Sequence, residues 1–137
     1  MKLLVSLLFA TVMFISTSIT AQNKTIKVTI ENISSDEGKV GFALYNKENF
    51  MKEPIMAKNA KIENGKTVVE FENVVPGEYA ITCYHDKNNN DRMDFSANRM
   101  PIEDYGVSNN VMSFGPPNYD DAKFVVADKN VSLIIKF

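Results

Sequence analysis

The sequence has one cysteine, one histidine and no tryptophan in 137 residues. The lone Cys83 excludes an internal disulfide, so we interpret it as a small buried side chain; the alternative is a bridge between two copies of the chain. With His85 as the only histidine, a zinc site of several His or Cys ligands is not expected. Basic charge is not in excess either, because the formal net charge is -2. Nucleic-acid binding, which needs clustered Lys and Arg, is therefore not expected.

Residues 1–21 form a segment of their own. Lys2 precedes an almost wholly apolar run from Leu3 to Ile15, and small polar residues follow it up to Ala21. This pattern predicts a secretory signal peptide, residues 1–21, that is cleaved after Ala21. A membrane anchor is the alternative, but the run is shorter than the roughly 20 residues of a spanning helix. We expect an exported protein, periplasmic or extracellular, with no membrane span after cleavage.

The remaining residues, 22–137, suffice for a single domain. They contain only two leucines but 11 valines and nine isoleucines, a composition that favours a sheet core. Apolar and polar residues alternate in several short segments separated by turn residues. The segments are Thr25–Glu31, Lys39–Tyr45, Tyr79–His85, Ala122–Val126 and Val131–Phe137, with the last two expected to pair with each other. About seven such strands predict an all-β fold, an antiparallel β-sandwich of the immunoglobulin-like or transthyretin-like kind.

Two turns refine this prediction. Asn64-Gly65 is the preferred pair for a two-residue hairpin turn, and it predicts cross-strand pairs from Glu63 and Lys66 outward to Ala60 and Val69. A Pro-Gly turn also precedes Tyr79, a corner at which a tyrosine ring is buried and its hydroxyl bonds to nearby backbone.

Oxygen-bearing side chains alternate in the segment HDKNNNDRMD. They are Asp86, Asn88, Asn90 and Asp94, at positions 1, 3, 5 and 9 of a loop. Calcium takes about six to eight oxygen ligands, and alternate residues of a tight loop can bring them to one ion. Arg92, at position 7, would add its backbone carbonyl. The pattern predicts a calcium site rather than a zinc site; the alternative is a solvated turn, which Asn and Asp also favour.

The loop differs from an EF-hand. Position 6 is Asp91 where glycine is expected, and position 12 is Ala97 where a bidentate glutamate is expected. The segment before the loop also reads as a strand and not as a helix. We therefore expect a calcium loop outside the EF-hand fold, with a further ligand from later in the chain. Glu103 is the first candidate for that ligand and Asp104 the second.

The same residues suggest a family. The loop and the segment PIEDYGVSNN that ends at Asn110 resemble secreted bacterial domains of unknown function. Those domains carry a His-Asp-x-Asn-x-Asn-type loop and a Glu-x-Tyr-Gly-x-Ser-Asn-Asn motif. The segments VPGEYA before the loop and PNYDDAKF after it fit as well. The resemblance implies an envelope-exported β-sandwich and brings no established activity.

No catalytic motif points to an enzyme. Ser108 lacks a Gly-x-Ser-x-Gly elbow, and His85 and Asp86 are neighbours that a strand directs to opposite faces. A secreted hydrolase or carbohydrate-active enzyme with paired carboxylates is the alternative function.

A structural or ligand-binding role is the expected function. The irregular stretch 93–121 holds aromatic residues that could form a platform for a glycan or protein ligand, although we expect them to pack mainly against the sandwich. They are Phe95, Tyr105, Phe114 and Tyr119.

Overall fold

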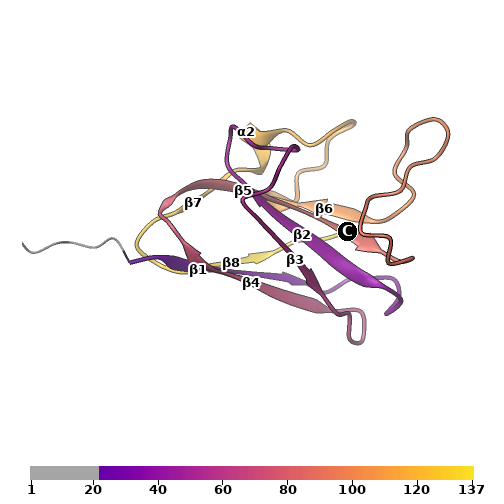
Figure 1. The fold of residues 1–137 in the computed structure, drawn as a ribbon, viewed down its shortest axis with the longest axis horizontal. Helices are drawn as coiled ribbons and strands as arrows, with labels where there is room; N and C mark the ends of the chain where they lie inside the picture. Colours follow the sequence, from indigo (N-terminus) through magenta and orange to yellow (C-terminus); the bar gives the residue numbers. More distant parts are fainter. Residues whose placement is uncertain (1–21) are drawn as a thin grey trace, which may run out of the picture.

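A computed structural model describes residues 22–137, so the signal peptide predicted for residues 1–21 lies outside the described residues. The described chain forms eight strands in two packed sheets, with one short helix and one 3₁₀ turn (Figure 1). This confirms the predicted all-β sandwich. None of the helices in residues 22–137 has the length and apolarity needed to cross a membrane.

The smaller sheet has three strands in the order β4-β1-β8. They are β1 (Lys24–Ile30), β4 (Thr67–Val74) and β8 (Val131–Ile134). β4 runs antiparallel to β1, whereas β8 runs parallel to it. The sandwich is therefore antiparallel except at this one pair of described strands.

The larger sheet has the order β3-β2-β5-β6, and β7 pairs with the first residues of β5. Its strands are β2 (Lys39–Tyr45), β3 (Met56–Ala60), β5 (Gly77–Asp86), β6 (Tyr105–Val107) and β7 (Phe124–Val126). The 3₁₀ turn η1 (Ser108–Asn110) follows β6, and the helix α2 (Tyr119–Ala122) precedes β7. All the pairs in this sheet are antiparallel.

The core lies between the two sheets. The residues that alternation predicts to face inward are buried there: Ile26, Val28 and Ile30 from β1, and Val40, Phe42 and Leu44 from β2. Cys83 is buried in the same core, which confirms the interpretation of a small buried side chain. Burial raises the pKa of its thiol, so the sulfur stays protonated and unreactive.

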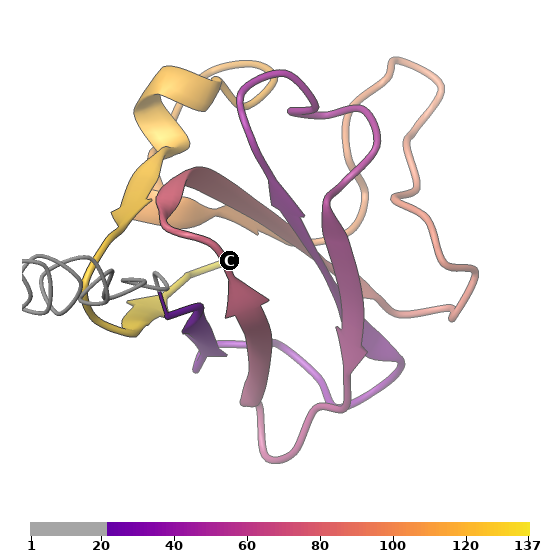
Figure 2. The same ribbon diagram turned by 60° about the vertical axis from the view of Figure 1, so that its left-hand side comes forward.

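The predicted hairpin pairing is wrong beyond its turn. The turn itself forms, with Asn64 and Gly65 in left-handed backbone and Glu63 bridged to Lys66. Ala60 and Val69 are not cross-strand partners, however, because β3 pairs with β2 and β4 pairs with β1. Figure 2 shows the chain crossing through this turn from β3 in one sheet to β4 in the other. The alternation of apolar and polar residues in β4 is compatible with either β3 or β1 as its partner. The turn alone therefore does not decide which strands pair.

The predicted pairing of the last two strands is also wrong. β7 adds to β5, with Val126 opposite Gly77, and β8 adds to β1, with Val131 opposite Ile26. The turn residues between them therefore carry the chain from one sheet to the other.

The tyrosine corner is confirmed. The Tyr79 hydroxyl donates a 2.6 Å hydrogen bond to the carbonyl of Val75, and the ring is partly buried against the core.

Candidate metal centre

The predicted loop follows the end of β5 directly. Asp86 is the last residue of this strand, and its side chain is fully buried. Its two carboxylate oxygens accept hydrogen bonds from the backbone N–H groups of Asn90, at 3.0 Å, and Asp91, at 2.9 Å. Asn89 and Asp91 take left-handed backbone, which turns the loop back over this carboxylate. Asp86 is thus the anchor around which the loop folds.

Three further predicted ligands converge beside the anchor. The Asn88 amide nitrogen lies 2.7 Å from Asp94 Oδ2, and the Asn90 amide nitrogen lies 2.8 Å from the same atom. The amide oxygens of the two asparagines accept backbone N–H bonds within the loop. The structure therefore brings together the side chains of positions 3, 5 and 9.

Glu103 reaches the loop from the segment before β6. Its side chain is buried, with 7% of the residue exposed. One carboxylate oxygen accepts the N–H of Lys87 at 3.2 Å, and the other accepts the N–H of Asp94 at 3.1 Å. Glu103 consequently joins the beginning and the end of the loop.

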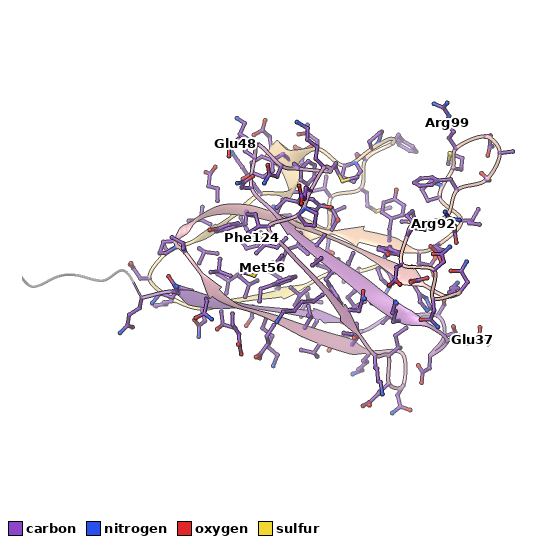
Figure 3. All side chains as sticks on the ribbon, in the orientation of Figure 1. Glu37, Glu48, Met56, Arg92, Arg99 and Phe124 are labelled. Atoms are coloured by element: carbon purple, nitrogen blue, oxygen red, sulfur yellow. The ribbon has the colours of Figure 1, made fainter. Side chains whose placement is uncertain are left out.

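Arg92 and Asp104 lie at the exposed side of the loop (Figure 3 labels Arg92). The Arg92 N–H donates to the Asn90 side chain, and its guanidinium lies 3.6 Å from Asp94. The Asp104 carboxylate accepts from Ser34 and pairs with Lys87 at 3.5 Å. Asp104 is thus turned to other partners, while the carbonyl role predicted for Arg92 stays a prediction.

Negative charge dominates this end of the molecule. Five carboxylates meet three basic side chains there: Asp86, Asp91, Asp94, Glu103 and Asp104 against Lys39, Lys87 and Arg92. Within residues 22–137, no group of three or more His, Cys, Asp or Glu stands close enough to hold a metal ion by itself. A site here would depend on the asparagine and backbone oxygens as well.

His85 belongs to the core and not to the loop. It is fully buried, and its Nε2 donates a 2.7 Å hydrogen bond to the carbonyl of Glu37. Its ring stacks on Phe137 with a centroid distance of 6.4 Å. Among the described residues, Nδ1 has no hydrogen-bond partner. The only histidine is therefore enclosed and cannot turn toward Asp94 and Glu103.

Comparison with known proteins places the chain in a family. Residues 28–134 match a family described as uncharacterized protein conserved in bacteria (DUF2141). The chain belongs to this family. The match runs from within β1 to the end of β8 and includes the whole loop. No curated protein and no solved structure matches the chain.

Sequence reasoning missed the role of the Ser-Asn-Asn segment in η1. The buried Ser108 hydroxyl donates to the carbonyl of Ala122 and accepts the N–H of Ile81 at 3.0 Å. Asn109 donates to the carbonyls of Asp121 and Lys123, and Asn110 bonds to the backbone that ends β8. Short polar side chains that bond to backbone are the available signal, but their distant partners could not be read from the sequence.

The expected packing of the aromatic residues in 93–121 holds for one of them. Tyr119 is buried and packs edge-on against Phe50. Phe95, Tyr105 and Phe114 are exposed, and Phe114 has no cover at all. The loops after β5 and after η1 therefore present apolar side chains to solvent.

Proposed function

We propose that the loop 86–94 binds one Ca²⁺ and that the protein is an exported, non-enzymatic bacterial β-sandwich domain stiffened by this ion. The observation that carries the proposal is the convergence of Asn88, Asn90 and Asp94 beside the buried carboxylate of Asp86. Calcium in proteins is bound by such carboxylate, amide and carbonyl oxygens from alternate loop residues.

The hydrogen bonds of the loop leave room for an ion. Each carboxylate oxygen of Asp86 and Glu103 accepts one backbone N–H and keeps a second lone pair. A half-turn of the Asn88 and Asn90 amides would place oxygen where nitrogen now faces Asp94, at the cost of the backbone N–H bonds that the two amide oxygens accept from Asn90 and Arg92. The ion would then replace two amide donors at the Asp94 carboxylate and offset the excess of negative charge. Arg92 would supply its carbonyl as a further ligand.

A non-enzymatic role is supported by the burial of the polar groups that could catalyse. His85 is enclosed and bonded to backbone, and the Ser108 hydroxyl is buried between two backbone groups. The carboxylates of Asp86 and Glu103 are buried and each accept two backbone N–H bonds, so both are engaged in holding the loop. A secreted hydrolase is therefore the weaker proposal.

The calcium proposal is tested by thermal unfolding in chelator and in Ca²⁺. Extracellular calcium modules have dissociation constants of about 10⁻⁴–10⁻³ M, and a loop with few carboxylates belongs in that range. Calcium at about 100 times the dissociation constant stabilises the folded state by about 2.7 kcal/mol. For a domain of this size, the melting temperature should rise by about 10 °C.

Each variant is judged by the difference between its melting temperatures in Ca²⁺ and in chelator, because losing a loop hydrogen bond lowers the melting temperature in both buffers. Asp86→Ala and Asn88→Ala should remove the calcium-dependent rise. Lys87→Ala is the matched control, because its side chain pairs only with Asp104 in the structure, and it should keep the rise. Equal melting temperatures for the wild type in both buffers would reduce the loop to a solvated turn.

A further inference from the structure

The outer face of the larger sheet carries a groove of about 900 Å³, a volume within the range of small-molecule sites. We call it the outer groove. Its floor consists of side chains that alternate away from the core. Ala57, Ala43 and Thr82 stand side by side across β3, β2 and β5. Because these side chains are small, the sheet is hollow at this place.

The next row of the floor has an aromatic base. Gly41 stands opposite Tyr84, and a Cβ added at Gly41 would lie 2.7 Å from Tyr84 Cε1. The tyrosine ring therefore lies over the glycine, along the sheet and not upright from it. Tyr105 continues the row on β6. A flat apolar surface suits a flexible ligand that lies along it.

One wall of the groove is a small hairpin beyond the loop. The Ile102 N–H donates to the Asp94 carbonyl at 3.1 Å, the Ser96 N–H donates to the Met100 carbonyl at 2.8 Å, and Phe95 is bridged to Pro101. Phe95 and Met100 are 58% and 60% exposed, although they line the groove. Methionine side chains adapt to irregular aliphatic ligands, and such a ligand would cover these exposed groups.

The charges around the groove select the ligand further. The lining carboxylate of Asp91 is paired with Lys39, and the Lys58 ammonium donates to the Glu70 carbonyl of the other sheet. Arg99 lines the mouth from the outer tip of the hairpin (Figure 3), and the salt bridges of the described residues do not include it. Of the two lining cations that form none of these salt bridges, Lys58 is turned toward the other sheet, so Arg99 is the cation at the mouth of the groove.

We propose that the outer groove binds an aliphatic carboxylate, with its hydrocarbon chain along the floor and its carboxylate at Arg99. A glycan fits less well, since its hydroxyl groups need several convergent polar partners, whereas the wall exposes Phe95 and Met100 and the neutral polar groups of the floor are Asn59, Thr82 and the hydroxyls of Tyr84 and Tyr105. The floor lies on strands, so this proposal does not rest on the calcium site.

The test is calorimetric titration with dodecanoate below its micelle concentration, in chelator, because Ca²⁺ precipitates such carboxylates. We expect saturable binding by the wild type. Two variants fill the floor: Ala43→Phe, and Ala57→Phe on the exposed edge strand. Each should weaken dodecanoate binding about tenfold or more, because excluding even two methylene groups of the ligand from the groove has about that effect on affinity. Val68→Phe, at a half-exposed position on the smaller sheet, is the control and should bind as the wild type does.

The carboxylate is tested at Arg99. Arg99→Gln should weaken dodecanoate binding about two- to fivefold, the range of an exposed ion pair, and leave dodecanol binding unchanged. Lys66→Gln, at the Asn64-Gly65 turn and not among the residues that line the groove, should change neither.

Four results would overturn the proposal. They are no dodecanoate binding by wild-type protein that is folded by circular dichroism, binding by both floor variants as tight as that of the wild type, a loss of binding in Val68→Phe as large as in the floor variants, and saturable binding of an oligosaccharide in place of dodecanoate.

Discussion

Tyr84 lies where the floor of the outer groove meets the proposed calcium loop. Burial raises the pKa of its phenol first, and the charges of Asp86, Asp91, Glu103 and Asp94 raise it further. A raised pKa favours the neutral phenol in the fold, so this contribution to stability is present below pH 10 and is lost as pH rises through the folded pKa.

This residue therefore reports on the charge of the loop. A dication bound there would oppose four of the causes that raise the pKa, so Ca²⁺ should lower the pKa of Tyr84 toward its ordinary value. Alkaline titration of phenolate absorbance in Ca²⁺ and in chelator measures the shift, and Tyr84→Phe identifies which transition belongs to this residue. A transition at the same pH in both buffers would count against an ion in the loop.

At the candidate site, the sequence predicts which side chains come together where the contacts are local, while calcium binding stays a prediction. The spacing of Asp86, Asn88 and Asn90 places them in one loop, and the structure brings them together because all lie within five residues. The pair of Lys39 and Asp91 was not foreseen. It joins residues 52 apart in the sequence and depends on the register of β2 against β5, which a single sequence does not specify.

At the scale of elements, η1 connects the two sheets. Its three consecutive side chains bond to the backbone of β5, of the α2 segment and of the chain after β8, so one turn ties both sheets together. The buried member, Ser108, holds two backbone groups that are shielded from water.

Ser108→Ala should lower the free energy of unfolding by about 1–3 kcal/mol. The substitution leaves the Ile81 N–H and the Ala122 carbonyl buried without a partner, and an unsatisfied buried group costs about that much. Denaturant unfolding measures the change. Ser132→Ala, on the exposed side of β8, should change the same free energy by less than about 0.5 kcal/mol. Equal changes in the free energy of unfolding for the two substitutions would refute the role of η1 as a connection between the sheets.

Element-level prediction found most of the strands but not β6, which lies within the stretch 93–121 that was expected to be irregular, and not all the partners. The alternation in β1 separates the buried apolar residues from the polar ones, whereas in β2 the predicted inward residues are buried but Gly41 and Tyr45 are buried as well. At the Asn64-Gly65 turn, the carboxylate of Asp36 accepts both turn N–H groups, at 2.9 and 2.8 Å. The turn is thus hydrogen-bonded to a distant loop, and β3 and β4 separate immediately beyond it. Hydrogen bonds between segments so far apart leave no local signal in the sequence.

On the scale of the whole molecule, export is the property that the first residues predict. The family match begins at Val28, after the predicted cleavage point, and β1 begins at Lys24. A folded domain that starts so close to Gln22 fits a leader that is removed.

We therefore expect the protein recovered from its native host to begin at or near Gln22. Amino-terminal sequencing or intact mass measurement of the envelope fraction decides this, and replacing Ala21 with a bulky residue should slow the processing. Folded protein that retains Met1–Ala21 would contradict the prediction.

The parallel pairing of β8 with β1 has a consequence for how the chain folds. Thr25 and Asn130 are joined although 105 residues separate them, and β8 fills one side of β1. β1 emerges long before β8, both at synthesis and in the proposed export, so the hydrogen-bonding groups on that side of β1 stay unpaired until the end of the chain has followed. Such contacts between distant parts of a sequence form slowly, and a waiting strand edge invites pairing with other chains. The growing polypeptide therefore depends on being kept apart from its neighbours until its smaller sheet can close.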